Sequence, residues 1–188
     1  MTTNGCSLMH SAESPFRGAF SAEAARFINV DLDGVLVDFY GATSKLLGAS
    51  YKEVPPAVAW GRLEQVPHLF RGLPRLADAL ELWAGLQGQG ALRILTAMPK
   101  PTGLLHTVPG DKRAWVREHL SGTVPVVVVA HGLAKALWAR PGDVLIDDLE
   151  RNIVAWRAAG GVGILHRNAR DTLAELRHLP LHADRCAG

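Results

Sequence analysis

Five short apolar runs recur along the chain, and each run ends in polar or turn-forming residues. Their apolar residues are nearly continuous instead of alternating with polar ones, which is typical of parallel strands buried on both faces. The pattern therefore predicts a parallel sheet. The runs are residues 27–30, 92–95, 125–130, 144–146 and 162–165.

Helical spacing separates these runs. Three stretches have apolar residues mainly at steps of three and four, which places them on one face of a helix. The stretches contain Leu76, Ala79, Leu80, Trp83 and Leu86; Trp115, Val116, His119 and Leu120; and Ile153, Val154, Trp156, Arg157 and Ala158. The alternation of strands and helices predicts an α/β fold, with a Rossmann-like parallel sheet flanked by helices.

The interval between the first two runs is too long for a single crossover. It spans about sixty residues, whereas one helix normally suffices. A helix that begins near Pro74 can serve as the crossover, so residues of about 38–73 are predicted to form a small helical cap inserted after the first strand. Residues 1–25 are predicted to be a loose tail with a short helix around 21–26, which leaves residues 26–188 as one domain.

The composition fits one compact domain. A chain of 188 residues is long enough for a single core with a small insert, and 48% hydrophobic against 20% charged residues argues against disorder. A net charge of +2 gives no indication that a nucleic-acid polymer or a membrane surface is a partner. The eight histidines show no HExxH or cysteine-pair spacing, so a zinc site is not expected.

The chain ends and the cysteines bear on cellular location. Residues 1–20 lack a sustained apolar stretch, so no signal peptide is expected, and the longest apolar run, residues 124–130, is too short to span a bilayer. Cys6 and Cys186 lie near opposite ends, which predicts free thiols in a reducing compartment. The expectation is a cytoplasmic protein.

Polar residues follow or end four of the predicted strands, where open α/β sheets bind their ligands. They are Asp31, Asp33 and Gly34 of a DxDG segment, Thr96, Lys135, and the pair Asp147 and Asp148. Each has an ordinary alternative. The DxDG segment can be a simple turn, Thr96 and Asp148 can cap a turn or a helix, and Lys135 can be a solvated surface lysine.

Taken together, these residues indicate phosphoryl chemistry. Four carboxylates at one sheet edge repel one another unless a cation and a lysine neutralise them. Mg²⁺ is the natural cation because only hard oxygen ligands are near. A metal, an ammonium group, a hydroxyl and a carboxylate that can attack phosphorus in line are what phosphoryl transfer requires.

The order DxDG, Thr, Lys and Asp-Asp, over residues of roughly 27–166, resembles the haloacid dehalogenase superfamily of phosphatases. The resemblance implies a small cap after the first strand and a phospho-aspartyl mechanism in which Asp31 is the nucleophile and Asp33 the general acid and base. It also implies that Thr96 and Lys135 hold the phosphoryl oxygens.

The same resemblance implies a Mg²⁺ site. The ion would be bound by the Asp31 carboxylate, the Asp33 main-chain carbonyl and one of Asp147 or Asp148, with Asp148 favoured as the direct ligand.

Five segments, residues 31–39, 70–74, 95–99, 111–115 and 145–148, are similar to the 5'(3')-deoxyribonucleotidase branch of that superfamily. The likeness implies that Lys112 also contacts the phosphate and that Phe39 lies against the base. Lys112 has an alternative as an exposed residue in the first turn of a helix, and Trp115 fits the core better than a ligand site. Ala97 stands where characterised members often have serine, so one phosphate contact is missing.

The sequence thus predicts a Mg²⁺-dependent phosphomonoesterase that acts on a small phosphorylated substrate, with a deoxyribonucleoside 5'- or 3'-monophosphate as the preferred interpretation. A phosphatase for a sugar phosphate or cofactor fragment is the first alternative, and a catalytically idle binding domain is the second. The oligomeric state is left open.

Overall fold

The computed structural model describes residues 26–99 and 106–179. The predicted tail, most of its short helix and both cysteines lie outside these residues. No helix within the two ranges is long and apolar enough to cross a membrane.

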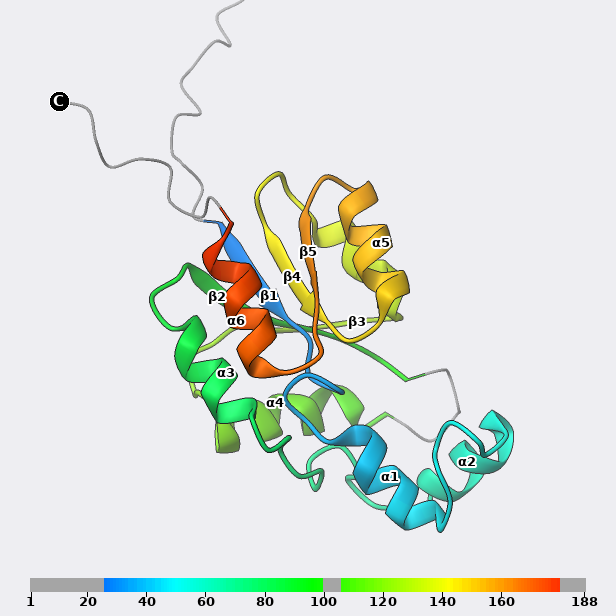
Figure 1. Ribbon diagram of the computed structural model, residues 1–188. Coiled ribbons are helices and arrows are strands. Elements are labelled where there is room, and N and C mark those ends of the chain that lie inside the picture. Colours follow the sequence, from blue (N-terminus) through cyan, green and yellow to red (C-terminus); the bar gives the residue numbers. More distant parts are fainter. Residues whose placement is uncertain (1–25, 100–105, 180–188) are drawn as a thin grey trace, which may run out of the picture.

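The centre of the molecule is a five-stranded parallel sheet in the order β3-β2-β1-β4-β5 (Figure 1). The strands are β1 (Phe27–Val30), β2 (Ala91–Ala97), β3 (Val126–Val129), β4 (Val144–Asp147) and β5 (Val162–Leu165). All five predicted runs form strands, with ends that differ by two residues at most. The predicted α/β fold with a Rossmann-like parallel sheet is confirmed.

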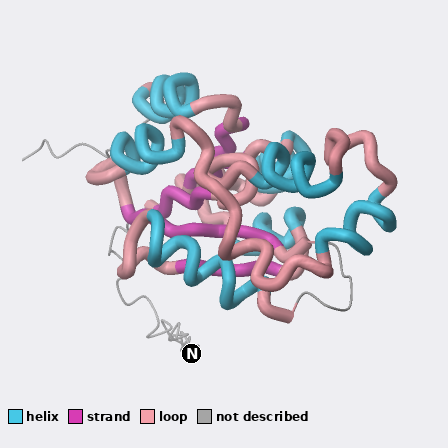
Figure 2. The backbone as a smooth tube through the Cα atoms, turned by 90° about the horizontal axis from the view of Figure 1, so that it is seen from below, coloured by secondary structure: helices cyan, strands magenta, loops and turns pink. Residues whose placement is uncertain are grey.

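Helices cover both faces of the sheet (Figures 1 and 2). One face packs against α5 (Glu150–Ala158) and the 3-10 helix η1 (Gly132–Trp138). The helices α3 (Ala79–Leu86), α4 (Val108–His119) and α6 (Ala169–Arg177) pack on the other face. Successive strand residues point to opposite faces, so Ile94 belongs to the larger core cluster and Leu95 to the smaller one.

Two helices, α1 (Phe39–Leu47) and α2 (Pro56–Leu63), lie between β1 and α3 in the sequence and beyond the carboxyl ends of β1 and β4 in space (Figure 1). Asp38 caps α1, because its Oδ1 accepts a 2.8 Å hydrogen bond from the Gly41 amide. The helix ends at Gly48, whose φ of 70° favours glycine. Pro56 is the first residue of α2, where its missing N–H costs no hydrogen bond.

The predicted start of the crossover helix near Pro74 is wrong, since α3 begins only at Ala79. Residues 74–76 pair with residues 36–38 instead. The Asp38 amide donates to the Pro74 carbonyl at 2.9 Å, and the Leu76 amide donates to the Leu36 carbonyl at 3.0 Å. These tertiary hydrogen bonds keep residues 74–76 extended, although Leu76 fits the helical spacing.

Two helices, α6 and η1, were not predicted from the sequence. Asn168 begins α6, and its side chain accepts a 2.8 Å hydrogen bond from the Asp171 amide. This asparagine before a helical pattern was the available signal for α6. The helix packs its buried side chains against α3 and β5.

His166 makes the stability of the folded state depend on pH. It follows β5, is 4% exposed, and contacts the Thr172 hydroxyl through Nδ1 at 2.8 Å. Burial lowers the pKa of His166 below its ordinary value. The folded state therefore takes up a proton less readily than the unfolded chain does.

We expect the stability due to neutral His166 to be complete above about pH 6.5, the ordinary histidine pKa, and to be lost as the pH falls through the lower folded-state pKa. The loss should not exceed about 1.4 kcal/mol per pH unit. Urea unfolding between pH 5 and pH 8 measures it. His166→Gln should lose less stability on acidification than the wild type, and an identical pH profile for the two proteins would contradict the prediction.

Candidate active site

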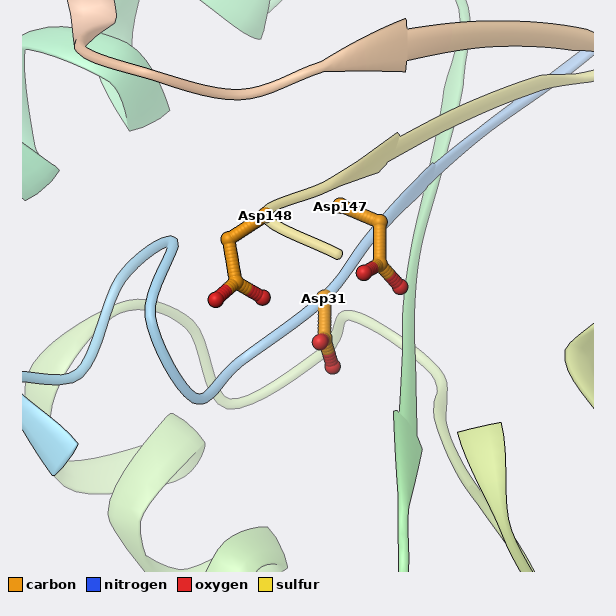
Figure 3. Close-up of side chains that lie close together, drawn as sticks. All are labelled: Asp31, Asp147 and Asp148. Atoms are coloured by element: carbon orange, nitrogen blue, oxygen red, sulfur yellow. The ribbon is translucent and has the colours of Figure 1, made fainter. Parts of the chain in front are cut away.

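Three aspartates meet at the carboxyl end of the sheet. Asp31 directly follows β1, Asp147 is the last residue of β4, and Asp148 comes next. Since β1 and β4 are parallel neighbours, their ends lie side by side. One carboxylate oxygen from each residue lies within 4.8 Å of the others, and the three side chains project into the same space (Figure 3).

The Lys135 side chain neutralises two of these carboxylates. It comes from η1 and is 1% exposed, so the alternative of a solvated surface lysine is wrong. Its Nζ lies 2.8 Å from Asp31 Oδ1 and 2.6 Å from Asp147 Oδ2. Burial alone would lower the pKa of Lys135, but the two carboxylates outweigh it and raise that pKa above its ordinary value. The group is therefore an ammonium ion at neutral pH.

Lys112 approaches from α4, on the other face of the sheet. It is fully buried, so the alternative of an exposed first-turn residue is wrong. Its Nζ donates to Asp33 Oδ2 at 2.5 Å, to the Thr96 hydroxyl at 2.9 Å and to the Ala97 carbonyl at 2.7 Å. Thr96 thus accepts a hydrogen bond from a lysine and does not merely cap a turn.

Asp33 lies at the same edge, and one of its oxygens is buried without a partner. Lys112 contacts Oδ2, whereas Oδ1 has no hydrogen bond from the described residues. Burial raises the pKa of Asp33 despite the opposing effect of Lys112, and the charge of Asp31 adds to the rise. Asp33 is accordingly a carboxyl group that can hold a proton closer to neutral pH than an ordinary aspartate.

The two adjacent aspartates differ in their surroundings. Asp147 accepts hydrogen bonds from the Leu149 amide at 2.9 Å and from Asn152 Nδ2 at 3.0 Å, besides its contact with Lys135. Asp148 instead has a buried Oδ1 without a partner among the described residues. It is Asp147, not Asp148, that contacts the start of α5. Burial first, and then the charges of Asp31 and Asp147, raise the pKa of Asp148 to about 7.

Gly34 permits the close approach of Asp148. Its φ is 83°, and a Cβ atom at this position would lie 2.5 Å from Asp148 Oδ2. Only glycine combines that backbone conformation with the available space. The DxDG segment is therefore a turn that also belongs to the carboxylate cluster.

The charges leave room for a divalent cation. Four carboxylates, those of Asp31, Asp33, Asp147 and Asp148, face the two ammonium groups of Lys112 and Lys135. With every group ionised, the balance of four negative and two positive charges is −2, which a Mg²⁺ ion would cancel. The donors are all hard oxygens, and one oxygen each of Asp33 and Asp148 is buried and unpaired. These residues fit a magnesium site.

Phe39 is the centre of an aromatic cluster next to this site. Its ring is stacked with Phe70 at a centroid distance of 5.9 Å and with Trp60 at 6.2 Å, and it meets Tyr40 and Tyr51 edge-on. Phe39 is only 7% exposed. The cluster reaches the site through Phe70, because the Lys112 ammonium lies 4.9 Å from the centre of that ring.

Trp115 does not belong to this cluster. It is fully buried, and its Nε1 donates to the Leu73 carbonyl at 2.7 Å. The expectation that Trp115 is a core residue fits this environment.

The family of the chain follows from comparison with known proteins. Residues 25–178 match the model of the family described as 5' nucleotidase, deoxy (pyrimidine), cytosolic type C protein (NT5C). The chain belongs to this family. It is therefore a phosphatase enzyme, and the resemblance to the haloacid dehalogenase superfamily is confirmed.

The chain is also similar to solved structures. A hydrolase from Streptococcus pneumoniae TIGR4 is 13% identical, with a TM-score of 0.50, and the match covers 81% of this chain and 98% of that one. A haloacid dehalogenase-like hydrolase from Burkholderia xenovorans LB400 is 14% identical, with a TM-score of 0.43, over 73% and 81% of the two chains. No match was found among the curated proteins.

Asn152 contacts the carboxylate cluster through its side chain and was not predicted from the sequence. It lies in the first turn of α5 and is 2% exposed. The available signal was its position four residues after Asp148, one helical turn into the element that follows the Asp-Asp pair.

We expect divalent-cation binding to the protein to depend on the protonation of Asp148. Since its pKa is about 7 without metal, the cation must displace a proton below that pH. The affinity for Mg²⁺ should therefore fall by up to about tenfold per pH unit below pH 7 and level off above it. Calorimetric titration with Mg²⁺ at pH 6, 7 and 8 measures this dependence.

Asp148→Asn is the matched control for the metal titration. It should bind Mg²⁺ weakly and with a flatter pH dependence than the wild type. If the two proteins lose affinity equally on acidification, the titrating group is another carboxyl group and the prediction is wrong.

Proposed function

We propose that the protein is a Mg²⁺-dependent phosphomonoesterase that removes phosphate from deoxyribonucleoside 5'- or 3'-monophosphates, with Asp31 as the nucleophile. One observation supports this most strongly: the Asp31 carboxylate is buried and held by Lys135 beside an unpaired Asp148 oxygen. Pairing with Lys135 would suit a structural carboxylate too, but a second carboxylate with an unpaired oxygen beside it destabilises the fold, so a structural role alone does not account for the arrangement. A nucleophile that must face a phosphate dianion needs positive charge close by.

Asp31 is oriented for attack by two donors on one oxygen. The Leu32 amide lies 2.8 Å from Oδ1, and the Lys135 ammonium lies at the same distance. In the first step a carboxylate oxygen of Asp31 attacks phosphorus and the bond from phosphorus to the ester oxygen breaks. The product is a phospho-aspartyl group on Asp31, with the leaving alcohol on the opposite side.

Asp33 would supply the proton that the leaving oxygen needs. Its raised pKa favours the protonated carboxyl group that this step consumes. In the second step the Asp33 carboxylate takes a proton from water, and the water oxygen attacks phosphorus. The bond between phosphorus and Asp31 then breaks, which releases inorganic phosphate and restores both carboxyl groups.

The phosphoryl oxygens would be held by Thr96, Lys112 and Lys135. Thr96 and Lys112 are already joined by a 2.9 Å hydrogen bond, and the two lysines come from opposite faces of the sheet. A phosphoryl group between them would contact positive charge on two sides. Ala97 has no hydroxyl group to add a further hydrogen bond from its side chain.

The residues proposed to hold Mg²⁺ are Asp31, Asp148 and, through its main-chain carbonyl, Asp33. Asp148 is preferred over Asp147 because the oxygens of Asp147 already accept from Lys135, Asn152 and the Leu149 amide. When bound, the ion neutralises charge on the phosphoryl oxygens and lowers the repulsion that an attacking carboxylate meets. Asp147 serves instead to hold Lys135.

The nucleotide substrate is inferred from the family and from the aromatic cluster around Phe39. A base needs a planar apolar surface near the phosphate, and the cluster lies next to Lys112 through Phe70. Because Phe39 is 7% exposed, a base could touch only a small part of its ring.

Asp31→Asn should fold as the wild type does and lose nearly all phosphatase activity. The amide cannot attack phosphorus, and it is a poor ligand for Mg²⁺. The activation free energy should therefore rise by many kcal/mol, and each increase of about 1.4 kcal/mol lowers the rate tenfold. Hydrolysis of p-nitrophenyl phosphate with and without Mg²⁺ measures the loss. Asp171→Asn, which alters an exposed carboxylate on α6, should keep full activity. Activity of Asp31→Asn within about tenfold of wild type would exclude Asp31 as the nucleophile.

Phe39→Leu tests whether the aromatic cluster contacts a base. Leucine keeps most of the buried apolar volume, whereas alanine would open a cavity worth about 3–5 kcal/mol. We expect kcat/KM for a deoxynucleoside monophosphate to fall by about tenfold, the lower end for base–aromatic stacking, because little of the ring is exposed. The value for p-nitrophenyl phosphate should change much less. Equal losses on both substrates would make Phe39 a packing residue and favour a phosphatase for another small phosphate.

A further inference from the structure

Asn152 is a buried polar residue to which the proposed chemistry gives no part. It is 2% exposed and lies in the first turn of α5. Its Nδ2 lies 3.0 Å from both carboxylate oxygens of Asp147. The amide therefore spans the Asp147 carboxylate and does not merely touch its edge.

Asp147 would be satisfied without this amide. Its Oδ1 accepts from the Leu149 amide at 2.9 Å, and its Oδ2 accepts from the Lys135 ammonium at 2.6 Å. Each oxygen thus has a donor already, so burial alone does not require Asn152. The amide adds a restraint on the rotation of the carboxylate, which sets the direction in which Oδ2 meets Lys135.

A second contact ties Asn152 to the helix that bears Lys135. A Cβ atom on Gly132 would lie 2.6 Å from Asn152 Oδ1, so the backbone at the start of η1 packs closely against the amide. Lys135 is three residues further along η1. Asn152 Oδ1 has no hydrogen-bond partner among the described residues, and exchanging the amide oxygen and nitrogen would place an oxygen against Asp147. The orientation in which the Asn152 amide nitrogen faces Asp147 is therefore the favourable one.

We propose that Asn152 is a positioning residue: it fixes the Asp147 carboxylate and the start of η1 so that the Lys135 ammonium bridges Asp147 and Asp31. The connection runs from Asn152 through Asp147 and Lys135 to the nucleophile, over contacts of 3.0, 2.6 and 2.8 Å. The placement of Lys135 stands on these contacts alone, whereas the effect on catalysis rests on the proposed function.

Asn152→Leu separates positioning from space filling. Leucine has a similar volume but donates no hydrogen bond, so a residue that only fills space would tolerate it. We expect kcat for p-nitrophenyl phosphate at saturating Mg²⁺ to fall by roughly 10- to 100-fold, the usual effect of losing a partner that orients a functional group. KM should change less, because a misplaced Lys135 harms the attack on phosphorus more than the encounter with substrate.

The metal-free protein provides a readout independent of activity. Lys112 and Lys135 are both buried and hydrogen-bonded, so their ammonium groups should give slowly exchanging ¹⁵N NMR signals, assigned with Lys112→Met and Lys135→Met. In Asn152→Leu the Lys135 signal should shift or broaden, while the Lys112 signal serves as an internal control. An unchanged Lys135 signal would overturn the proposal, whatever happens to kcat.

Gly132→Ala changes the other contact of the Asn152 amide, the one with the start of η1. It is the second variant if Asn152→Leu does not fold. Its new methyl group should displace the Asn152 amide, shift the Lys135 signal and lower kcat. Gly122→Ala is the matched control, since a Cβ atom there meets nothing within 4 Å. Equal effects of the two glycine variants would also overturn the proposal. If Asp31→Asn kept its activity while Asn152→Leu gave the expected change at Lys135, the proposed function would be refuted and the positioning role would stand.

Discussion

The ammonium group of Lys135, held between the carboxylates of Asp31 and Asp147, is the interaction on which the rest of the site depends. Two buried carboxylates at the ends of adjacent strands would destabilise the fold by several kcal/mol if no cation accompanied them. The cation comes from η1, a short helix whose main packing partners are α5 and the strands. Placing one charge therefore requires η1, α5 and β4 to be correctly assembled.

The parallel topology creates this requirement. The Asp31 amide donates to the Ile146 carbonyl at 2.9 Å, so the pairing of β1 with β4 extends to the first residue beyond the strand. The backbones that carry the two acidic side chains cannot move apart without breaking that pairing. The fold thus holds like charges together at this edge of the sheet, which lowers the stability of the folded state. Lys112 makes a similar arrangement on the opposite face, with Asp33 and Thr96.

The strands and the residues at their ends could be predicted from the sequence, because both depend on local pattern. Buried strands are visible as apolar runs, and a parallel sheet brings their carboxyl ends to one edge, as Asp31 and Asp147 show. What the sequence could not give depends on contacts between distant segments. The start of α3 was misplaced because residues 74–76 pair with residues 36–38. Asn152 is a different case, because its partner Asp147 lies only five residues away and its place one helical turn beyond the Asp-Asp pair was a signal that went unused. For Lys112 the resemblance implied a contact with the phosphate, whereas its place in the first turn of a helix suggested an exposed side chain. The side chain is fully buried, so the suggestion from the helical turn was wrong.

The pairing of residues 36–38 with 74–76 has a further consequence. The chain leaves and re-enters the α/β core at two points joined by backbone hydrogen bonds and by the antiparallel bridge between Val37 and Arg75. The ends of the intervening segment are thus fixed by the core itself, and the entropy of closing a loop grows only slowly with its length. The loop between α1 and α2 can therefore be lengthened or shortened at little cost to the sheet, whereas Phe70 and Leu73 are held by contacts with Lys112 and Trp115. Such an arrangement lets evolution, or an engineer, vary the surface beyond the carboxylate cluster while the edge of the sheet that bears the cluster stays unchanged.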